Sequence, residues 1–210
     1  GLLPIVVVHL CYALSVQASH VPLCLPYWDG CTSISRAARH GWANHLFKAG
    51  MLPVAGLMLV YWWLAAHWLR TLPAQRRGRI VAMQALGVIG ALFLILYATF
   101  LGVDGDVYRW LRRYGVTVYF SFTVLAQMLM ASVLDRGRLR RTLIGLCAAM
   151  LLLGLASIPL QHLFADTDVP LNALEWAYAL LMSLGFAGVG VAWWRRGTGL
   201  SFSSACRGGW

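Results

Sequence analysis

The sequence has few charged residues for its length. Only 11% of its 210 residues are charged, whereas ordinary soluble domains have about one quarter. It contains a single lysine and a single glutamate, while hydrophobic residues make up 60% of the chain. A soluble core cannot absorb so many apolar side chains, because a chain of this size needs polar cover. The composition excludes an ordinary soluble domain and argues against collagen-like, disordered and disulfide-framework proteins.

The apolar residues fall into six blocks separated by short polar connections. Most blocks hold about twenty residues, which as an α-helix span about 30 Å of hydrocarbon. The blocks are Leu2–Val16, Phe47–Leu69, Ile80–Leu101, Tyr114–Leu134, Leu143–Leu160 and Ala173–Trp194. The sequence therefore predicts an all-α integral membrane protein, a bundle of six transmembrane helices. We expect one membrane domain over residues 1–196, with an ordered first external loop at 18–46, and a flexible cytoplasmic tail at 197–210.

The net charge of +10 is confined to alternate connections. The connections after the second and fourth blocks and the segment after the sixth hold eleven cations and one acid, whereas the other three connections hold six of each. Such an excess marks the cytoplasmic side of a membrane protein. Both termini are therefore predicted to be cytoplasmic, and no nucleic-acid partner is needed to explain the charge. Sixteen arginines against one lysine, with abundant Ala, Leu and Gly, indicate a bacterial source and hence the inner membrane.

Cysteine and histidine provide little evidence for a metal or cofactor. Cys24 and Cys31 share the first external loop, where an oxidising compartment would allow a disulfide or leave two free thiols. There is no Cys-x-x-Cys motif. His9, His67 and His162 are expected at different depths in the membrane, which argues against the paired axial ligands of a b-type haem. We expect neither a metal site nor a cofactor.

The first external loop is the longest and most polar connection. Long loops in compact proteins are usually functional. Ser33 and Ser35 lie in it near Asp29 and several histidines, but the sequence has no Gly-x-Ser-x-Gly motif that would hold a catalytic serine. We therefore treat the loop as a candidate binding segment and leave open whether any reaction is catalysed.

Charged side chains cluster at the external ends of the later helices. The sole glutamate, Glu175, lies at the mouth of the last helix, where an ionisable group is costly unless paired or solvated. Three arginines open the fourth helix, and their planar guanidinium groups suit phosphate. The simpler alternatives are a carboxylate favoured by the helix dipole and arginines that extend to the interface. We predict a lipid head-group site that contains Arg109, Arg112, Arg113, Glu175, Ser35 and His45.

Three short segments resemble motifs of one known family. They are Ser33-Ile34-Ser35, the stretch from Leu111 to Phe120, and Leu174-Glu175-Trp176. In this order, on six apolar blocks, they are similar to the FRAG/DRAM/SFK superfamily, which includes DRAM autophagy modulators and GPI-lipid-remodelling factors. The resemblance covers residues 30–195 and implies a lipid-related membrane protein. Its departures are a basic segment, 36–41, in place of an acidic one and Arg112 in place of a histidine, which imply binding without catalysis.

Two classes of function follow. The first is an integral membrane protein that binds or helps to remodel a phospholipid or glycolipid in the outer leaflet. The alternative is a non-catalytic accessory subunit that packs against other integral membrane subunits in a larger complex. A transporter is less favoured, because no span is clearly interrupted and no central ionisable pair exists.

Overall fold

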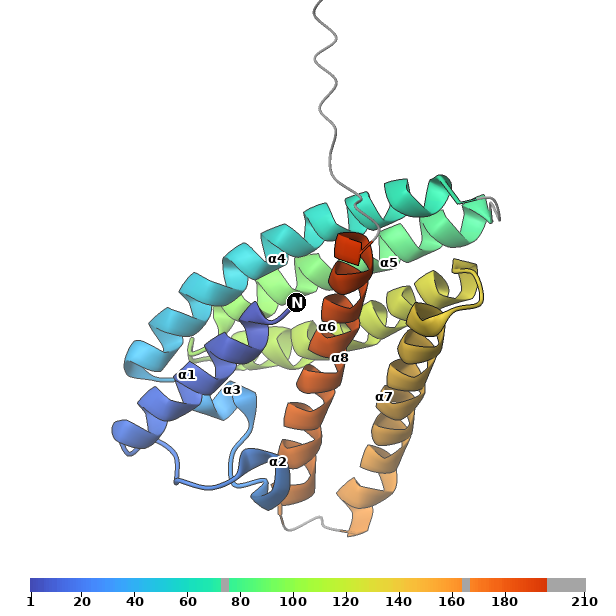
Figure 1. Ribbon diagram of the computed structural model, residues 1–210. Helices are drawn as coiled ribbons and strands as arrows, with labels where there is room; N and C mark the ends of the chain where they lie inside the picture. Colours follow the sequence, from blue (N-terminus) through green and yellow to red (C-terminus); the bar gives the residue numbers. More distant parts are fainter. Residues whose placement is uncertain (73–75, 164–166, 196–210) are drawn as a thin grey trace, which may run out of the picture.

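The computed structural model describes residues 1–72, 76–163 and 167–195, and within these ranges the regular elements are all helices. The predicted tail at 197–210 lies outside the described residues. The helices are α1 (Leu3–Gln17), α2 (Pro26–Asp29), α3 (Ile34–Ala37), α4 (Gly41–Arg70), α5 (Arg77–Phe100), α6 (Asp106–Val133), α7 (Arg138–Leu163) and α8 (Val169–Arg195). Figure 1 shows α4, α5 and α6 running together, with α7 beside α8 and α1 lying against α4.

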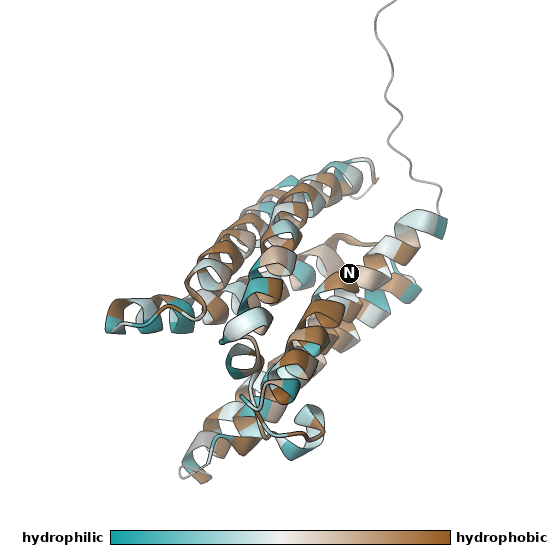
Figure 2. Cartoon of the chain, turned by 90° about the vertical axis from the view of Figure 1, so that its left-hand side faces the viewer, coloured by the Kyte–Doolittle hydropathy of each residue, from teal (hydrophilic) through white to brown (hydrophobic). Residues whose placement is uncertain are grey.

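Five of these helices are long and apolar enough to cross a membrane, namely α4, α5, α6, α7 and α8. At 1.5 Å per residue each is about 36–45 Å long, which exceeds about 30 Å of hydrocarbon. Figure 2 shows hydrophobic residues along all of the bundle, including its outer side. The prediction of an all-helical membrane protein is confirmed for these five helices. The first predicted span corresponds to α1, a shorter apolar helix of 15 residues.

Glycines allow α5 and α8 to approach their neighbours closely. A Cβ atom on Gly87 would lie 2.2 Å from the ring of Trp62, and one on Gly185 would lie 2.7 Å from the Gln127 amide oxygen. Small residues at such positions bring helix backbones together inside membranes, where burial of apolar surface gives little driving force. These contacts hold α4, α5, α6 and α8 around a common core that contains the fully buried Trp62.

The connection between α1 and α4, predicted as the first external loop, is shorter than the sequence predicts. We expected it to run to residue 46, but α4 begins at Gly41, so that residues 18–40 form the connection and contain α2 and α3. The added residues, 41–46, lie before the apolar block because Asn44 and His45 interrupt the apolar pattern there. This first part of α4 is stable because the buried Asn44 side-chain amide donates to the carbonyls of Ala38 (3.0 Å) and Leu101 (2.9 Å).

This connection is closed on itself by a disulfide. Cys24 and Cys31 are joined, with their Cα atoms 6.5 Å apart. The Tyr12 hydroxyl of α1 donates to the Cys24 carbonyl and accepts from the Cys24 amide, both at 2.8 Å. Gly30, inside the disulfide loop, adopts a left-handed φ of +55° after α2. The disulfide loop is thereby attached to α1.

The same connection is attached to the first turns of α8. The Asn172 side-chain amide donates to the Gly30 carbonyl at 2.8 Å, and the indole N–H of the fully buried Trp176 donates to the Thr32 carbonyl at 2.9 Å. These bonds satisfy polar groups that would otherwise be buried without partners. They fix the segment that follows the disulfide, residues 32–37, directly over the position of Glu175.

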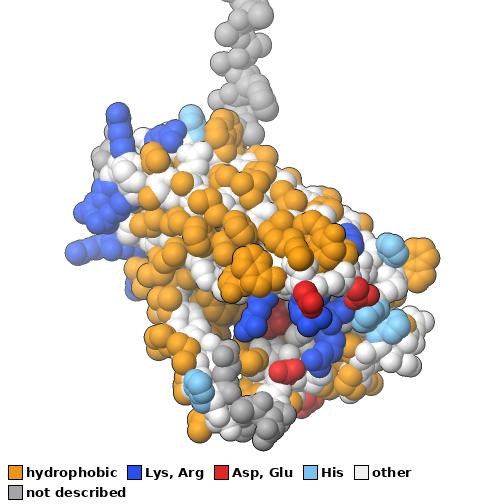
Figure 3. Space-filling model, turned by 180° about the vertical axis from the view of Figure 1, so that it is seen from behind, with side chains coloured by type: hydrophobic (Ala, Val, Ile, Leu, Met, Phe, Trp, Pro, Cys, Tyr) orange, Lys and Arg blue, Asp and Glu red, His pale blue; other side chains and the backbone are white. Residues whose placement is uncertain are grey.

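Charged side chains divide between the two ends of the bundle. Figure 3 shows Lys and Arg gathered at one end, hydrophobic side chains across the middle, and a mixture of basic, acidic and histidine side chains around a hollow at the other end. In Figure 1 the α4–α5 and α6–α7 connections lie on the same side of the molecule. The separation along the chain of basic and mixed connections therefore corresponds to a separation in space.

Candidate functional site

Ser35 and Glu175 meet at the mixed-charge end, 140 positions apart in sequence. The Ser33 hydroxyl caps α3 by accepting the Arg36 amide at 3.1 Å, which fixes the turn that presents Ser35. The backbone amide and the hydroxyl of Ser35 both donate to Glu175 Oε1, each at 3.4 Å. Two of the three segments that carry the family resemblance therefore contact each other.

Tyr97 of α5 completes this polar cluster. Its hydroxyl lies 2.7 Å from the Ser35 hydroxyl, and its side chain is buried and packs edge-on against Phe47. The sequence did not identify Tyr97, since it is one of several tyrosines near the end of an apolar block, where interfacial anchoring is the usual role. We call Ser35, Tyr97 and Glu175 the polar cluster.

Arginines surround the polar cluster without forming an ion pair with it. Arg39 and Arg112 lie close enough to Tyr97 to interact with it electrostatically, as Arg36 does with Glu175. The Arg39 Nε is buried and has no hydrogen-bond acceptor among the described residues. A guanidinium N–H in this condition is available to an anionic group that enters the site.

The predicted arginines and histidine differ in their relation to the cluster. Arg112 is nearby, but its Nη1 donates to the carbonyls of Phe100 (3.2 Å) and Val103 and so closes the α5–α6 turn. Exposed Arg109 pairs with Asp106 at 3.1 Å, one turn away on the same helix. Arg113 on α6 and His45 are both exposed. The His45 ring packs edge-on against Trp42. Of the six predicted residues, Ser35 and Glu175 are joined and Arg112 adjoins them.

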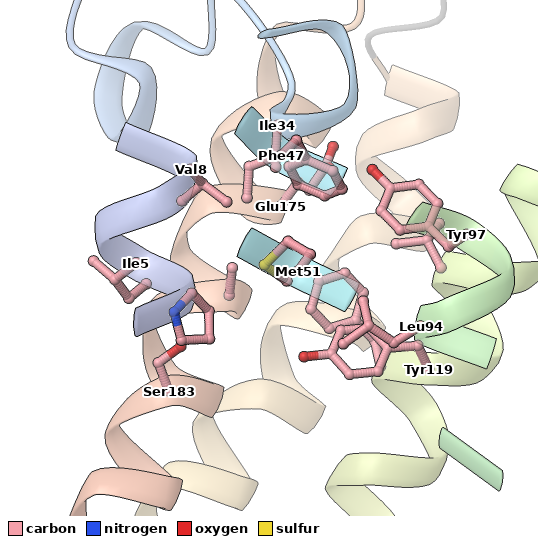
Figure 4. Close-up of a pocket in the computed structure, with 14 residues that line it drawn as sticks. Ile5, Val8, Ile34, Phe47, Met51, Leu94, Tyr97, Tyr119, Glu175 and Ser183 are labelled. Carbon is pink, nitrogen blue, oxygen red and sulfur yellow. The ribbon is translucent and has the colours of Figure 1, made fainter. Parts of the chain in front are cut away.

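An apolar cavity of about 40 Å³ lies directly below the polar cluster. Figure 4 shows Glu175 and Tyr97 toward one end of this cavity, Tyr119 and Ser183 toward the other, and aliphatic side chains between them. Its walls come from α1, α3, α4, α5, α6 and α8. The cluster therefore borders both the polar end of the bundle and a space inside its apolar part.

A second cavity, of about 280 Å³, continues along α1, α4 and α8. The two cavities share Pro4, Tyr119 and Ser183, and the second extends to Trp193. Leu3 and Leu57 on its wall are 47% and 62% exposed, so it opens on the outer side of the bundle. We call the two cavities together the crevice. It runs from the polar cluster to the far end of α8.

Histidine and carboxylate side chains are dispersed over the part of the chain that the structure describes. Within residues 1–72, 76–163 and 167–195, no three His, Cys, Asp or Glu side chains gather as ligands. His9 is engaged instead with the Ile5 carbonyl (Nδ1, 2.7 Å) and the Tyr27 hydroxyl (Nε2, 3.2 Å). Burial raises the pKa of Tyr27 above its ordinary value. No histidine contacts Ser35 in the described part of the chain, so the geometry gives this serine no imidazole base.

The fold and the site together define a helical membrane protein with a buried polar cluster next to an apolar crevice. The chain matches no protein-family model, no curated protein and no solved structure.

Proposed function

We propose that this protein binds a phospholipid or glycolipid, with the polar head at Ser35, Tyr97 and Glu175 and an acyl chain in the crevice. The observation that carries this proposal is the direct junction of a polar cluster with an apolar cavity. An ionisable residue inside a membrane helix is costly and usually marks a functional site. A ligand with a polar end and an apolar end matches such a junction.

The length of the crevice supports a lipid. Glu175 and Ser183 are eight residues apart on α8, which corresponds to about 12 Å, and Trp193 lies about 15 Å further along. The crevice thus spans about 27 Å, close to the 30 Å of a hydrocarbon core. The part next to the polar cluster, about 12 Å long, would hold the head and the groups that join it to the chain. The remaining part, about 15 Å, is as long as one leaflet and would hold an acyl chain.

The charges favour a head group that carries a phosphate. Glu175 provides one carboxylate, and Arg39 and Arg112 provide cations near the cluster, while Arg36 also pairs with Asp168 at 3.2 Å. A zwitterionic head would place its amine near Glu175 and its phosphate near the Arg39 guanidinium. The positive-inside distribution would put this end in the outer leaflet of a bacterial inner membrane, with both termini cytoplasmic.

Filling the first cavity is expected to prevent lipid retention. Ala179 lies on its wall, and Ala179→Leu adds three carbon atoms to the passage between the polar cluster and the rest of the crevice. We expect about tenfold lower occupancy of the co-purifying lipid in native mass spectra, equivalent to about 1.4 kcal/mol. The control is Ala148→Leu on α7, the same change at an exposed residue. Equal lipid occupancy in the two variants would contradict the proposal.

A second candidate function, an accessory subunit, is favoured by α7. Only 17% of its apolar window is buried, compared with 39% in α4 and α5. Its exposed side chains include Leu152, Leu155 and Ile158, which face either lipid or a partner subunit. Native spectra of gently extracted protein distinguish the two: a defined assembly with other subunits supports this candidate, and a lone chain with a discrete lipid mass supports the first.

A further inference from the structure

Two hydroxyl groups face the narrow part of the crevice, where its two cavities meet. Tyr119 of α6 and Ser183 of α8 line both cavities. Figure 4 shows them on opposite walls, with the Tyr119 hydroxyl pointing across the cavity toward the side on which Ser183 lies. They lie at the other end of the first cavity from the polar cluster, in the apolar part of the bundle.

Neither hydroxyl has a hydrogen-bond partner among the described residues, although Tyr119 is only 8% exposed and Ser183 only 5%. Three other hydroxyls on the long helices bond to a carbonyl one turn earlier. They are those of Thr117 (2.8 Å), Ser132 (2.7 Å) and Ser157 (2.7 Å). Thr123 is also without a partner, but it lies against Gly90 and lines neither cavity. Tyr119 and Ser183 therefore combine burial, unused donors and access to a cavity.

The two residues are buried, but their hydroxyl oxygens are not among the described buried atoms that lack a partner, so they are open to the cavity. A hydroxyl that faces an apolar space without a partner destabilises a protein. Two such groups on facing walls therefore indicate a ligand that supplies acceptors at this depth. Eight residues of α8 separate Ser183 from Glu175, a distance of about 12 Å. In a lipid whose head reaches Glu175, the groups that link the head to the acyl chains would lie near this depth.

We propose that Tyr119 and Ser183 donate hydrogen bonds to the ester carbonyl oxygens of the bound lipid, which makes the ligand an acyl-ester lipid. This inference rests on the lipid-binding function proposed above and narrows its ligand class. Isoprenoid chains and ether-linked alkyl chains lack a carbonyl acceptor at this position. The site therefore distinguishes lipids by the linkage between head and chain as well as by the head itself.

The test compares two phospholipids with the same head group and chain length, one with ester and one with ether linkages. Both are offered in equal amounts to the full chain in detergent, and the bound ratio is read from native mass spectra. Two neutral hydrogen bonds predict about tenfold preference for the ester lipid. Tyr119→Phe combined with Ser183→Ala is expected to bring the ratio near one. Thr117→Ala removes a hydroxyl already bonded within its own helix and is expected to leave the ratio unchanged.

Two results would overturn the inference. One is equal binding of both lipids by the unaltered protein, as expected if water alone occupies the cavity. The other is a preference that persists in the double variant. Either result leaves the lipid-binding function standing, provided that lipid is retained and Ala179→Leu reduces it. Retention of neither lipid would overturn the proposed function and this inference together.

Discussion

Gly30→Ala is expected to be among the most destabilising single substitutions in the protein. A Cβ atom at this position would lie 1.9 Å from the Val169 carbonyl oxygen and 2.8 Å from its carbon. These are backbone atoms in the first turn of α8, so the clash is relieved only if the disulfide loop separates from that helix. The left-handed φ of +55° adds about 1–2 kcal/mol for any residue with a side chain.

We expect Gly30→Ala to cost about 3–4 kcal/mol, from the backbone strain together with the clash. Gly41→Ala is the matched control, because Gly41 has a φ of +53° but an added Cβ would meet only the His20 ring, at 3.6 Å. It should cost about 1–2 kcal/mol. Thermal unfolding in detergent measures both. Equal shifts in melting temperature would show that Gly30 is not packed against α8.

The second large effect is expected on ligand binding, from Glu175→Gln. Glutamine keeps a side-chain oxygen that accepts the two Ser35 donors, so the docked loop should be retained. The substitution removes the negative charge that would pair with a head-group amine. A charge-assisted hydrogen bond contributes about 1.5–3 kcal/mol, which predicts about 10- to 100-fold weaker binding of phosphatidylethanolamine. Phosphatidylglycerol, which has no amine, should be affected little.

The control for this experiment is Asp106→Asn, which removes an exposed acid that pairs only with Arg109. It should leave the binding of both lipids unchanged. If Glu175→Gln weakens the two lipids equally, then Glu175 does not contact an amine, and the zwitterionic assignment is wrong. If it affects neither lipid, Glu175 serves only to hold Ser35 and the loop.

The sequence indicated the membrane class because the hydropathy and length of each apolar segment can be read directly from the sequence, without knowledge of the tertiary structure. It also indicated Glu175, because an ionisable group at the end of a membrane helix is costly unless it is paired or solvated. Ser35 came from its place in the polar loop, and it also lies in a segment that resembles the FRAG/DRAM/SFK superfamily, an assignment that stays a prediction. Its contact with Glu175 needed the structure, because it depends on how Asn172 and Trp176 position the loop on α8.

Other parts of the site could not be predicted. The crevice results from the angles between helices, and hydropathy determines the length of a span but not its tilt. Tyr97, Tyr119 and Ser183 lie in apolar blocks, where isolated hydroxyl groups usually bond within their own helix. The role of Arg112 at the α5–α6 turn depends on two carbonyls that α5 leaves exposed at its end. Such contacts are tertiary and leave no local pattern.

The most direct test of the account is photo-cross-linking with an ester-linked phospholipid that carries a diazirine near the end of one acyl chain. A lipid held with its head at the polar cluster would label residues of the second cavity, such as Met58, Phe186 or Gly190. Ala179→Leu should reduce these adducts about tenfold, as it reduces lipid occupancy. Labelling confined to exposed residues of α7, such as Leu152 and Leu155, would show that the lipid only surrounds the bundle and would contradict a specific lipid site.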